Sequence, residues 1–323
     1  MRTFIRSIGA ACLAGATTCA ITPAHAQTYP SKPVRMVIAS TPGSGLDIHA
    51  RLAADNLAAI WKQSVLMEYK PGGAMAIGAS FVAKAPPDGY TLFFSIDAPF
   101  VVNPLAIPNL PYKVSDLQPV SFWSLNPFVL VVNAELPVKT VPELLAHMRA
   151  NPGKLNAASA SATTLLAHEL FRTIAGVNYT TITYKGGTES IASLASGETQ
   201  LAIYDLGNAA AMIKAGKIRV IAQTPSKRAS IMPDLPTVAE GGMPGFESGT
   251  WGAIFAPAGT PRDIVDKINA DLKTILARPD IRDKLREYGV EAHHSTPEEL
   301  AQSIAASTAR WDKLIRERGI KLQ

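Results

Sequence analysis

Short apolar runs alternate with segments of helical periodicity along most of the chain. The first run, residues 34–39, lies between Pro33 and Pro42 and is typical of a buried parallel strand. Residues 41–45 then break regular structure with a proline and two glycines. The apolar residues that follow fall on one helical face: Ile48, Leu52, Leu57, Ile60 and Trp61. This stretch therefore predicts a strand, a glycine loop and a helix.

The same alternation continues almost to the C-terminus. Further strands are expected at residues 64–69, 90–95, 155–158, 180–184, 201–205, 219–223 and 250–255. Helices are expected to include residues 165–174, 208–215, 261–277, 279–288 and 297–318. The apolar runs within residues 120–133 suit strands that cross between two lobes.

This order predicts an α/β protein made of two lobes, each a mostly parallel sheet flanked by helices. We place the first lobe at residues 27–127 plus 253–323, so that the chain returns to it, and the second lobe at residues 128–252. Loops at the carboxyl ends of parallel strands would then face one another across a cleft. We expect the two lobes to close on a ligand by a hinge motion.

The N-terminal residues have the pattern of a cleaved export signal. Arg2 and Arg6 form a positive region, residues 8–21 are largely apolar and small, and Ala24-His25-Ala26 fits a cleavage site. The apolar part is too short to span a membrane. We therefore expect residues 1–26 to be removed and the mature protein to be periplasmic.

Both cysteines, Cys12 and Cys19, lie within this segment, so the mature chain would carry no thiol. Lipid attachment at Cys19 is the alternative, but the three residues before it, 16–18, make a poor attachment sequence. Disulfides, a cysteine nucleophile and thiolate metal sites are thereby excluded for the mature chain. Its stability must come from its core, for which 47% hydrophobic residues suffice.

Charge and histidine placement restrict the function further. The chain has 31 basic and 26 acidic residues, and without Arg2 and Arg6 the balance is 29 − 26 = +3. There is no basic run, which argues against a nucleic-acid partner. His168-Glu169 lacks the second histidine of a zinc-protease helix, and His293-His294 has no third ligand in view. We expect no metal and no cofactor.

The loop after the first strand is the strongest candidate for a binding site. Backbone amides of Ser44, Gly45 and Leu46 would point outward at the positive end of a helix, which suits an anion. The same residues also fit a capping box, with Ser44 as the cap and Asp47 three residues later. Spacing alone leaves both interpretations open. The loop lacks the glycines of a dinucleotide site, and the chain has no phosphate-binding GxxxxGK[ST] motif.

Asp97, at the end of another strand, would lie on the same side of the cleft as this loop, and further residues at strand ends would face both from the second lobe. These candidate ligand-binding residues are Asp97, Ser159, Ser161, Thr163, Thr164, Lys185, Gly186 and Asp205. Asp97 could equally be a turn residue. If it contacts the ligand, a carboxylate beside an anion site indicates an amine or hydroxyl at the far end of that ligand.

A series of short motifs, in order along the chain, resembles the Bug proteins, the extracytoplasmic solute receptors of tripartite tricarboxylate transporters. The early motifs are Tyr29-Pro30-x-Lys32-Pro33-Val34-Arg35, Pro42-Gly43-x-Gly45-x-Asp47, Pro87-Asp88-Gly89-Tyr90-Thr91-Leu92 and Asn103-Pro104. The later ones are Tyr184-Lys185-Gly186, Asp234-x-Pro236-Thr237-Val238-Ala239-Glu240 and Ala256-Pro257-Ala258-Gly259-Thr260-Pro261. Together they cover essentially all of the mature chain.

The resemblance implies a two-lobed periplasmic-binding-protein fold of type II-like architecture, without catalysis. It also implies a small organic carboxylate in the cleft, held by the first glycine loop and the matching loop of the second lobe, and delivery to a membrane permease. The loop at Ser44, Gly45 and Asp47 matches the first of these loops, and residues 159–164 occupy the second. We expect a monomer.

Three positions depart from the family pattern. Leu46 stands where a hydroxyl residue is usual, Leu165 stands where a histidine is expected after a shortened loop, and Asp97 replaces a small hydroxyl residue. These changes predict a cleft less polar than average and a ligand more apolar than citrate, such as an aromatic or branched carboxylate. A periplasmic sensor subunit and, less favoured, an exported α/β enzyme are the alternative functions. The chain has no GxSxG motif to support the enzyme.

Overall fold

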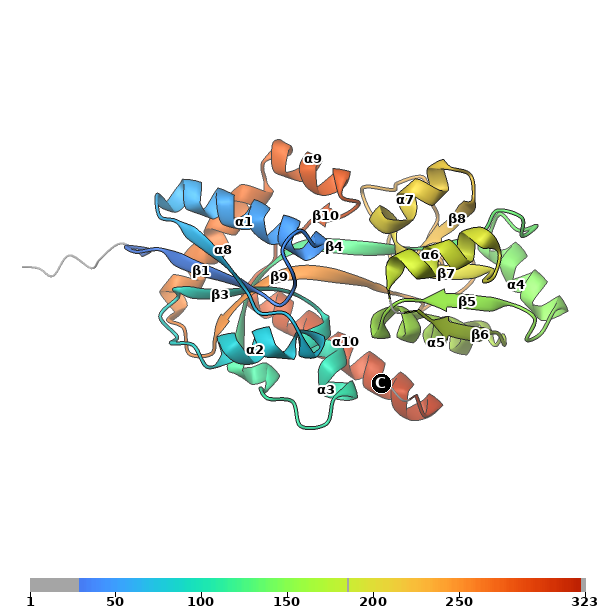
Figure 1. Ribbon diagram of the computed structural model, residues 1–323, viewed down its shortest axis with the longest axis horizontal. Helices are drawn as coiled ribbons and strands as arrows, with labels where there is room; N and C mark the ends of the chain where they lie inside the picture. Colours follow the sequence, from blue (N-terminus) through green and yellow to red (C-terminus); the bar gives the residue numbers. More distant parts are fainter. Residues whose placement is uncertain (1–28, 185, 321–323) are drawn as a thin grey trace, which may run out of the picture.

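The computed structural model describes residues 29–184 and 186–320. The segment expected to be an export signal and the candidate residue Lys185 lie outside the described residues. Figure 1 shows two lobes side by side, joined by long strands in the middle of the molecule. The predicted two-lobed α/β fold is confirmed.

A mixed sheet of ten strands runs through the described part of the molecule, in the order β2-β1-β3-β9-β4-β7-β5-β6, with β8 and β10 each also pairing with β4. In the first lobe the strands are β1 (Val34–Ile38), β2 (Val65–Tyr69), β3 (Thr91–Ile96) and β10 (Glu291–Ala292). In the second lobe they are β5 (Asn156–Ser159), β6 (Thr180–Thr183), β7 (Leu201–Asp205) and β8 (Ile218–Gln223). The outer strands pair in parallel, β1 with β2 and β3, and β5 with β6 and β7.

Two long antiparallel strands, β4 (Leu117–Asn133) and β9 (Gly249–Pro257), join the lobes. β4 pairs with β9 as far as Pro127, opposite Gly249, and from Phe128 onward it pairs with β7. The expected crossing strands are therefore one continuous strand and its returning partner. We propose that the first crossing between lobes lies between Pro127 and Phe128, because β4 changes partner there.

Helices cover both faces of the first lobe. They are α1 (Gly45–Trp61), α2 (Ala76–Ala83), α3 (Asn103–Ala106), α8 (Arg262–Leu276), α9 (Pro279–Glu287) and α10 (Pro297–Arg318), with the short turns η1 (Gly73–Met75), η2 (Ala98–Val102) and η3 (Val114–Asp116). Figure 1 shows α10 running from the first lobe to beneath the second, where it contacts α5 (Ala162–Ala175).

The second lobe carries four helices among the described residues: α4 (Val141–Ala150), α5, α6 (Gly187–Ser196) and α7 (Leu206–Lys214). Two of them begin earlier than expected. Ser161, in a segment expected to be a loop, caps α5, and Asp205, expected to be the last residue of a strand, caps α7. Within residues 29–184 and 186–320, every helix is too short or too polar to cross a lipid bilayer.

Strand alternation divides the core between the two faces of the sheet. In β1, Val34, Met36 and Ile38 pack under α1 and α8, whereas Val37 points to the opposite face. That second face continues into the other lobe through Leu130 of β4 and neighbouring apolar residues. Because both lobes share this core along β4, the sheet gives the cleft between them a rigid base.

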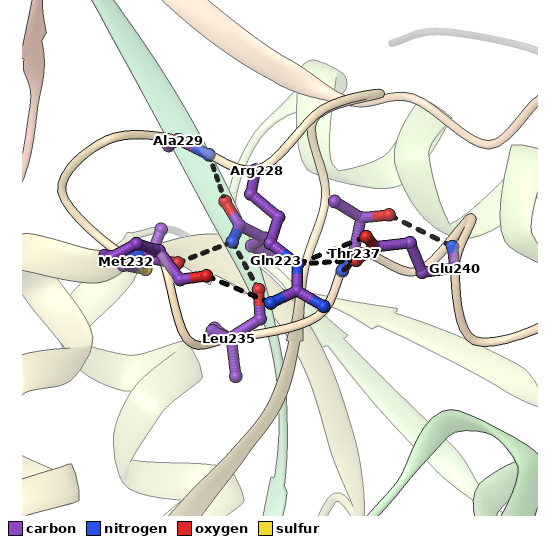
Figure 2. A network of polar contacts seen from close by, with 8 residues as sticks. Gln223, Arg228, Ala229, Met232, Leu235, Thr237 and Glu240 are labelled. Atoms are coloured by element: carbon purple, nitrogen blue, oxygen red, sulfur yellow. Dashed lines mark hydrogen bonds and ion pairs between the residues drawn. The ribbon is translucent and has the colours of Figure 1, made fainter.

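The loop between β8 and β9 is organised by the buried side chain of Gln223, as Figure 2 shows. Its Nε2 donates to the carbonyl oxygens of Met232 (2.8 Å) and Leu235 (2.5 Å), and its Oε1 accepts from the amide of Ala229 (2.7 Å). The Glu240 carboxylate accepts from the Thr237 amide and from Arg228 in the same loop: the two distances are 2.7 and 2.9 Å. These bonds account for the Thr237–Glu240 motif as a structural element.

Candidate functional site

A cleft of about 680 Å³ lies between the two lobes and draws its lining from both. Four helices begin at this cleft, each contributing residues of its first turn: Gly45 of α1, Ala162 of α5, Gly187 of α6 and Gly207 of α7. Asp97, which follows β3, also lines it. Each of these helices follows a strand, so the cleft lies at the carboxyl ends of β1, β5, β6 and β7, as expected for an α/β sheet.

Only some of the residues predicted from the first glycine loop line the cleft. Gly45 and Leu46 line the cleft, but Ser44 and Asp47 do not. Ser44 caps α1: its hydroxyl accepts from the Asp47 amide at 3.2 Å and from the Ser40 hydroxyl at 2.8 Å. The helix therefore satisfies one of its own amides, which is the capping interpretation.

Asp47 is buried beneath the loop and holds it in shape. Its carboxylate accepts from the Gly43 amide (2.7 Å), from Arg51 Nε (3.1 Å) and from the Tyr69 hydroxyl (2.9 Å). Burial raises the pKa of this carboxyl, but these three donors outweigh it and lower the pKa overall. Because these oxygens are engaged within the loop, we propose a capping role for Ser44 and a positioning role for Asp47 in place of the direct ligand contacts expected from the sequence.

The second loop is closed in a similar way. Ser161 caps α5, accepting from the Thr164 amide at 3.2 Å, while Thr164 Oγ1 accepts from the Ser161 amide at 3.0 Å. Ser161, Thr163 and Thr164 line the cleft. Ser159 does not: it is fully buried, and its hydroxyl lies 2.8 Å from Thr164 Oγ1. Ser159 therefore supports the loop from below.

The start of α6 is the cleft helix end without a side-chain cap. Gly186 stands at its cap position and offers no side-chain acceptor, unlike Ser44, Ser161 and Asp205 on the other three helices. Gly187 lines the cleft, whereas Gly186 does not. A Cβ added at Gly187 would lie 1.6 Å from the Tyr204 hydroxyl, so only glycine fits there. A helix start without a side-chain cap is a position that suits a bound anion.

Asp205 lines the cleft at the end of β7 and caps α7. Its two carboxylate oxygens accept from the amide and the side-chain nitrogen of Asn208, at 2.9 and 2.8 Å. Asp205 was singled out from the sequence for its place at a strand end, and the structure puts it at the cleft with its carboxylate engaged by its own helix.

Asp97 is a buried acid at the cleft, with 5% of its surface exposed. Its Oδ1 accepts a hydrogen bond from the Thr250 hydroxyl of β9. Burial raises the pKa of this carboxyl to about 6, against the opposing effect of hydrogen bonds from Thr250 and from backbone amides.

Several cleft residues were not identified from the sequence. His49 and Tyr288 line the cleft with their rings 5.5 Å apart, and burial lowers the pKa of His49 to about 4. Asn103, Asn126 and Thr250 add polar groups from α3, β4 and β9. Asn103 stands in a motif used for the family resemblance, and that motif was the available signal. Tyr288 comes from the end of α9, and no local pattern places that segment at the cleft.

The described cleft lining contains no lysine or arginine. Helix ends, amides and hydroxyls supply its polar groups, and much of the wall is apolar: Leu46, Ile48, Met75, Phe94, Ile96, Val102, Phe128 and Val290. Leu165, by contrast, is not part of this wall. Such a site can hold an anionic group at a helix N-terminus and a hydrocarbon body beside it. Among residues 29–184 and 186–320, no group of three or more His, Cys, Asp or Glu is placed to hold a metal ion.

The chain matches the tripartite tricarboxylate transporter family receptor (TctC) over residues 49–320. It belongs to that receptor family. The resemblance to Bug proteins is confirmed by Bordetella pertussis BugT, to which the chain is 33% identical over 307 residues, covering 93% of this chain and 94% of BugT. This is a family of periplasmic solute-binding receptors rather than of enzymes.

Two solved structures extend the comparison. R. palustris Rpa4515 with adipate is 34% identical, with a TM-score of 0.78 over 91% of this chain and 99% of that chain. MatC from Rhodopseudomonas palustris with bound malate is 27% identical, with a TM-score of 0.71 over 89% of this chain and 100% of that chain. The lobes and cleft described above are therefore the family fold.

Proposed function

We propose that this protein is a periplasmic receptor that captures a small organic carboxylate in the cleft between its lobes. The observation that carries the proposal is the uncapped start of α6 at Gly187, facing a cleft to which three further helices bring their N-termini. Amides and helix dipoles stabilise a carboxylate there without a basic side chain. Two related structures, one with adipate and one with bound malate, support a carboxylate as the ligand class.

The apolar wall of the cleft favours a ligand with a hydrocarbon body. Leu46 and Phe94 lie on this wall, and the family resemblance leads us to expect a hydroxyl residue at position 46. A ligand more apolar than citrate would bury this body against the wall at about 25 cal/mol per Å² of apolar surface.

The receptor would deliver its ligand to the membrane permease of a tripartite tricarboxylate transporter, and we propose that it acts as a monomer in the periplasm. Family membership supports this partner. The proposal includes no catalytic step. His168, which resembles part of a zinc-protease motif, is fully buried and hydrogen-bonded to the Ala158 carbonyl and the Tyr179 hydroxyl, each at 3.1 Å.

Thermal unfolding against a panel of mono-, di- and tricarboxylates tests the proposal. A ligand present at about 100 times its Kd should add about 2.7 kcal/mol to the unfolding free energy, which is a shift of several degrees. Gly187→Ala should abolish this shift, because the new Cβ would displace the Tyr204 ring. Tyr204→Phe alone should keep it, and serves as the control for the change in the ring. A panel without any shift would reject the function.

A further inference from the structure

Asp97 places a negative charge inside a site suited to anions. It follows β3 directly, and only 5% of the residue's surface is exposed to solvent. An ionised carboxylate at such a position is costly unless an opposite charge compensates it.

The charged and titratable groups near Asp97 do not supply that opposite charge. On the cleft side they are His49, Tyr204, Asp205 and Tyr288. On the opposite side, where Asp97 also lines a second cavity of about 340 Å³, they are Lys227, Arg228, Glu247, Glu291 and Arg310.

The basic groups of that second cavity have other partners or lie in solvent. Arg310 pairs with Glu247 at 3.3 Å, Arg228 pairs with Glu240 at 2.9 Å, and Lys227 is exposed. His49 is held neutral at physiological pH, because burial lowers its pKa to about 4. If Asp97 is ionised, the ligand is therefore the remaining source of a compensating positive charge in the described part of the cleft.

Resting on the function proposed above, we propose that Asp97 selects a carboxylate ligand that carries an ammonium group at its remote end. The ligand's carboxylate binds at the helix N-termini, where α5 and α6 begin. Its ammonium group donates to Asp97, whose other hydrogen-bond partner is the hydroxyl of Thr250. The apolar wall lies along the hydrocarbon chain that joins the two ends.

The competing arrangement is a protonated Asp97 that donates to a second ligand carboxylate. The two arrangements predict opposite effects of pH. Ammonium binding requires the ionised acid, so affinity falls as the pH drops through the pKa of Asp97, about 6. Binding of a second carboxylate requires the protonated acid, so affinity rises over the same range.

Calorimetric titration with two matched sets of ligands tests the inference. One set is γ-aminobutyrate, glutarate and butyrate, and the other is δ-aminovalerate, adipate and valerate. Within each set only the remote group changes, from ammonium to carboxylate to methyl. At pH 7.5 we expect the amino acid of at least one set to bind ten or more times as tightly as its diacid and monoacid. We expect its affinity to fall about tenfold per pH unit well below pH 6.

Asp97→Asn should remove both the preference for the amino acid and its pH dependence. Thr250→Val, which removes the donor to Asp97, should move the midpoint of the pH profile upward while the preference remains. This second variant keeps the test valid if Asp97→Asn does not fold.

The possible results distinguish a failure of the proposed role of Asp97 from a failure of the proposed receptor function. A diacid that binds more tightly than its matched amino acid, or equally well, overturns the role of Asp97 and leaves the receptor function intact. The same holds if affinity for the amino acid rises on acidification. If these ligands and the broader carboxylate panel all fail to bind, the proposed function itself is rejected.

Discussion

Gly207 meets the backbone of Tyr288 so closely that an added Cβ would lie 3.0 Å from the Tyr288 carbonyl oxygen. Gly207 is in the first turn of α7 in the second lobe, and Tyr288 ends α9 in the first lobe. The contact is reciprocal, since a Cβ on Gly289 would lie 3.1 Å from the Gly207 amide nitrogen. The two lobes therefore touch backbone to backbone at the edge of the cleft, and both contact residues line it.

Gly207→Ala should impede closure of the lobes. The added methyl group faces a carbonyl oxygen of the opposite lobe, so the closed state must open slightly, and we expect ligand affinity to fall about three- to tenfold. The ligand-free protein should unfold at the same temperature or slightly higher, because alanine is the better helix former by about 1 kcal/mol.

Ala210→Ser is the matched control, because Ala210 is exposed on the same helix and does not line the cleft. Calorimetry measures the affinities, and small-angle scattering with and without ligand reports the closure. Unchanged affinity and compaction in Gly207→Ala would show that this contact does not accompany ligand capture.

Asp47 should act on binding through the shape of the first loop. Asp47→Asn weakens bonds to the Gly43 amide, Arg51 and Tyr69, so we expect a loss of about 2 kcal/mol in the unfolding free energy and a severalfold loss of affinity. Arg51→Met should change affinity in the same direction by less, although Arg51 does not line the cleft.

Urea denaturation and ligand titration of both variants provide the measurement. If Asp47→Asn abolishes binding while its stability stays at the wild-type value, Asp47 contacts the ligand directly and the positioning role is wrong.

The stability of the protein should depend on the neutral form of His168. Burial lowers the pKa of this residue to about 4, against an ordinary value of 6.5. Above pH 6.5 the residue is neutral in both states, and below it the unfolded chain takes up a proton that the folded protein refuses. The free energy of unfolding therefore has its full value above pH 6.5 and falls by about 3 kcal/mol as the pH drops toward 4.

His168→Gln should flatten this dependence relative to the wild-type protein. Denaturant titrations at intervals between pH 7 and pH 4 give the two slopes, and His49 remains in both proteins as a shared contribution. Equal slopes in the wild-type protein and the variant would contradict the assignment to His168.

Gln223→Met should destabilise the protein without affecting ligand selectivity. The buried side-chain amide of Gln223 makes hydrogen bonds to three backbone groups of the 224–240 loop. Methionine, of similar length, would leave the Ala229 amide and the Leu235 carbonyl unpaired, and the Met232 carbonyl would keep only the Leu235 amide as donor. We expect a loss of about 2–3 kcal/mol in the unfolding free energy. Thermal unfolding provides the measurement. A change of less than one degree in the unfolding temperature would show that Gln223 does not stabilise the loop.

The sequence predicted the parts of the site that depend on local patterns. Strand ends followed by small polar residues placed Gly45, Leu46, Ser161 and Asp205 at the cleft. Local patterns could not decide which oxygen atoms remain available to a ligand. By sequence alone, Asp47 and Ser159 are equally suited to contact a ligand. In the structure the Asp47 carboxylate accepts from the Tyr69 hydroxyl and the Ser159 hydroxyl lies against that of Thr164, and only the folded chain brings these partners together.

Other cleft residues could not be predicted because contacts between segments far apart in the sequence place them there. Tyr288 lies there because α9 returns to the first lobe, and Thr250 lies there because β9 pairs with β4, which sets Thr250 opposite Asn126. Neither position has a local signal of its own. Lys185 lies outside the described residues, so its proposed place at the cleft stays a prediction.

A crystal structure with the carboxylate that most stabilises the protein tests the central claim most directly. We expect the carboxylate oxygens within hydrogen-bonding distance of backbone amides in the first turns of α5 and α6, with Gly207 still against Tyr288. Ligand bound only in the second cavity beside Arg310, or only on the outer surface with an empty cleft, would contradict the account.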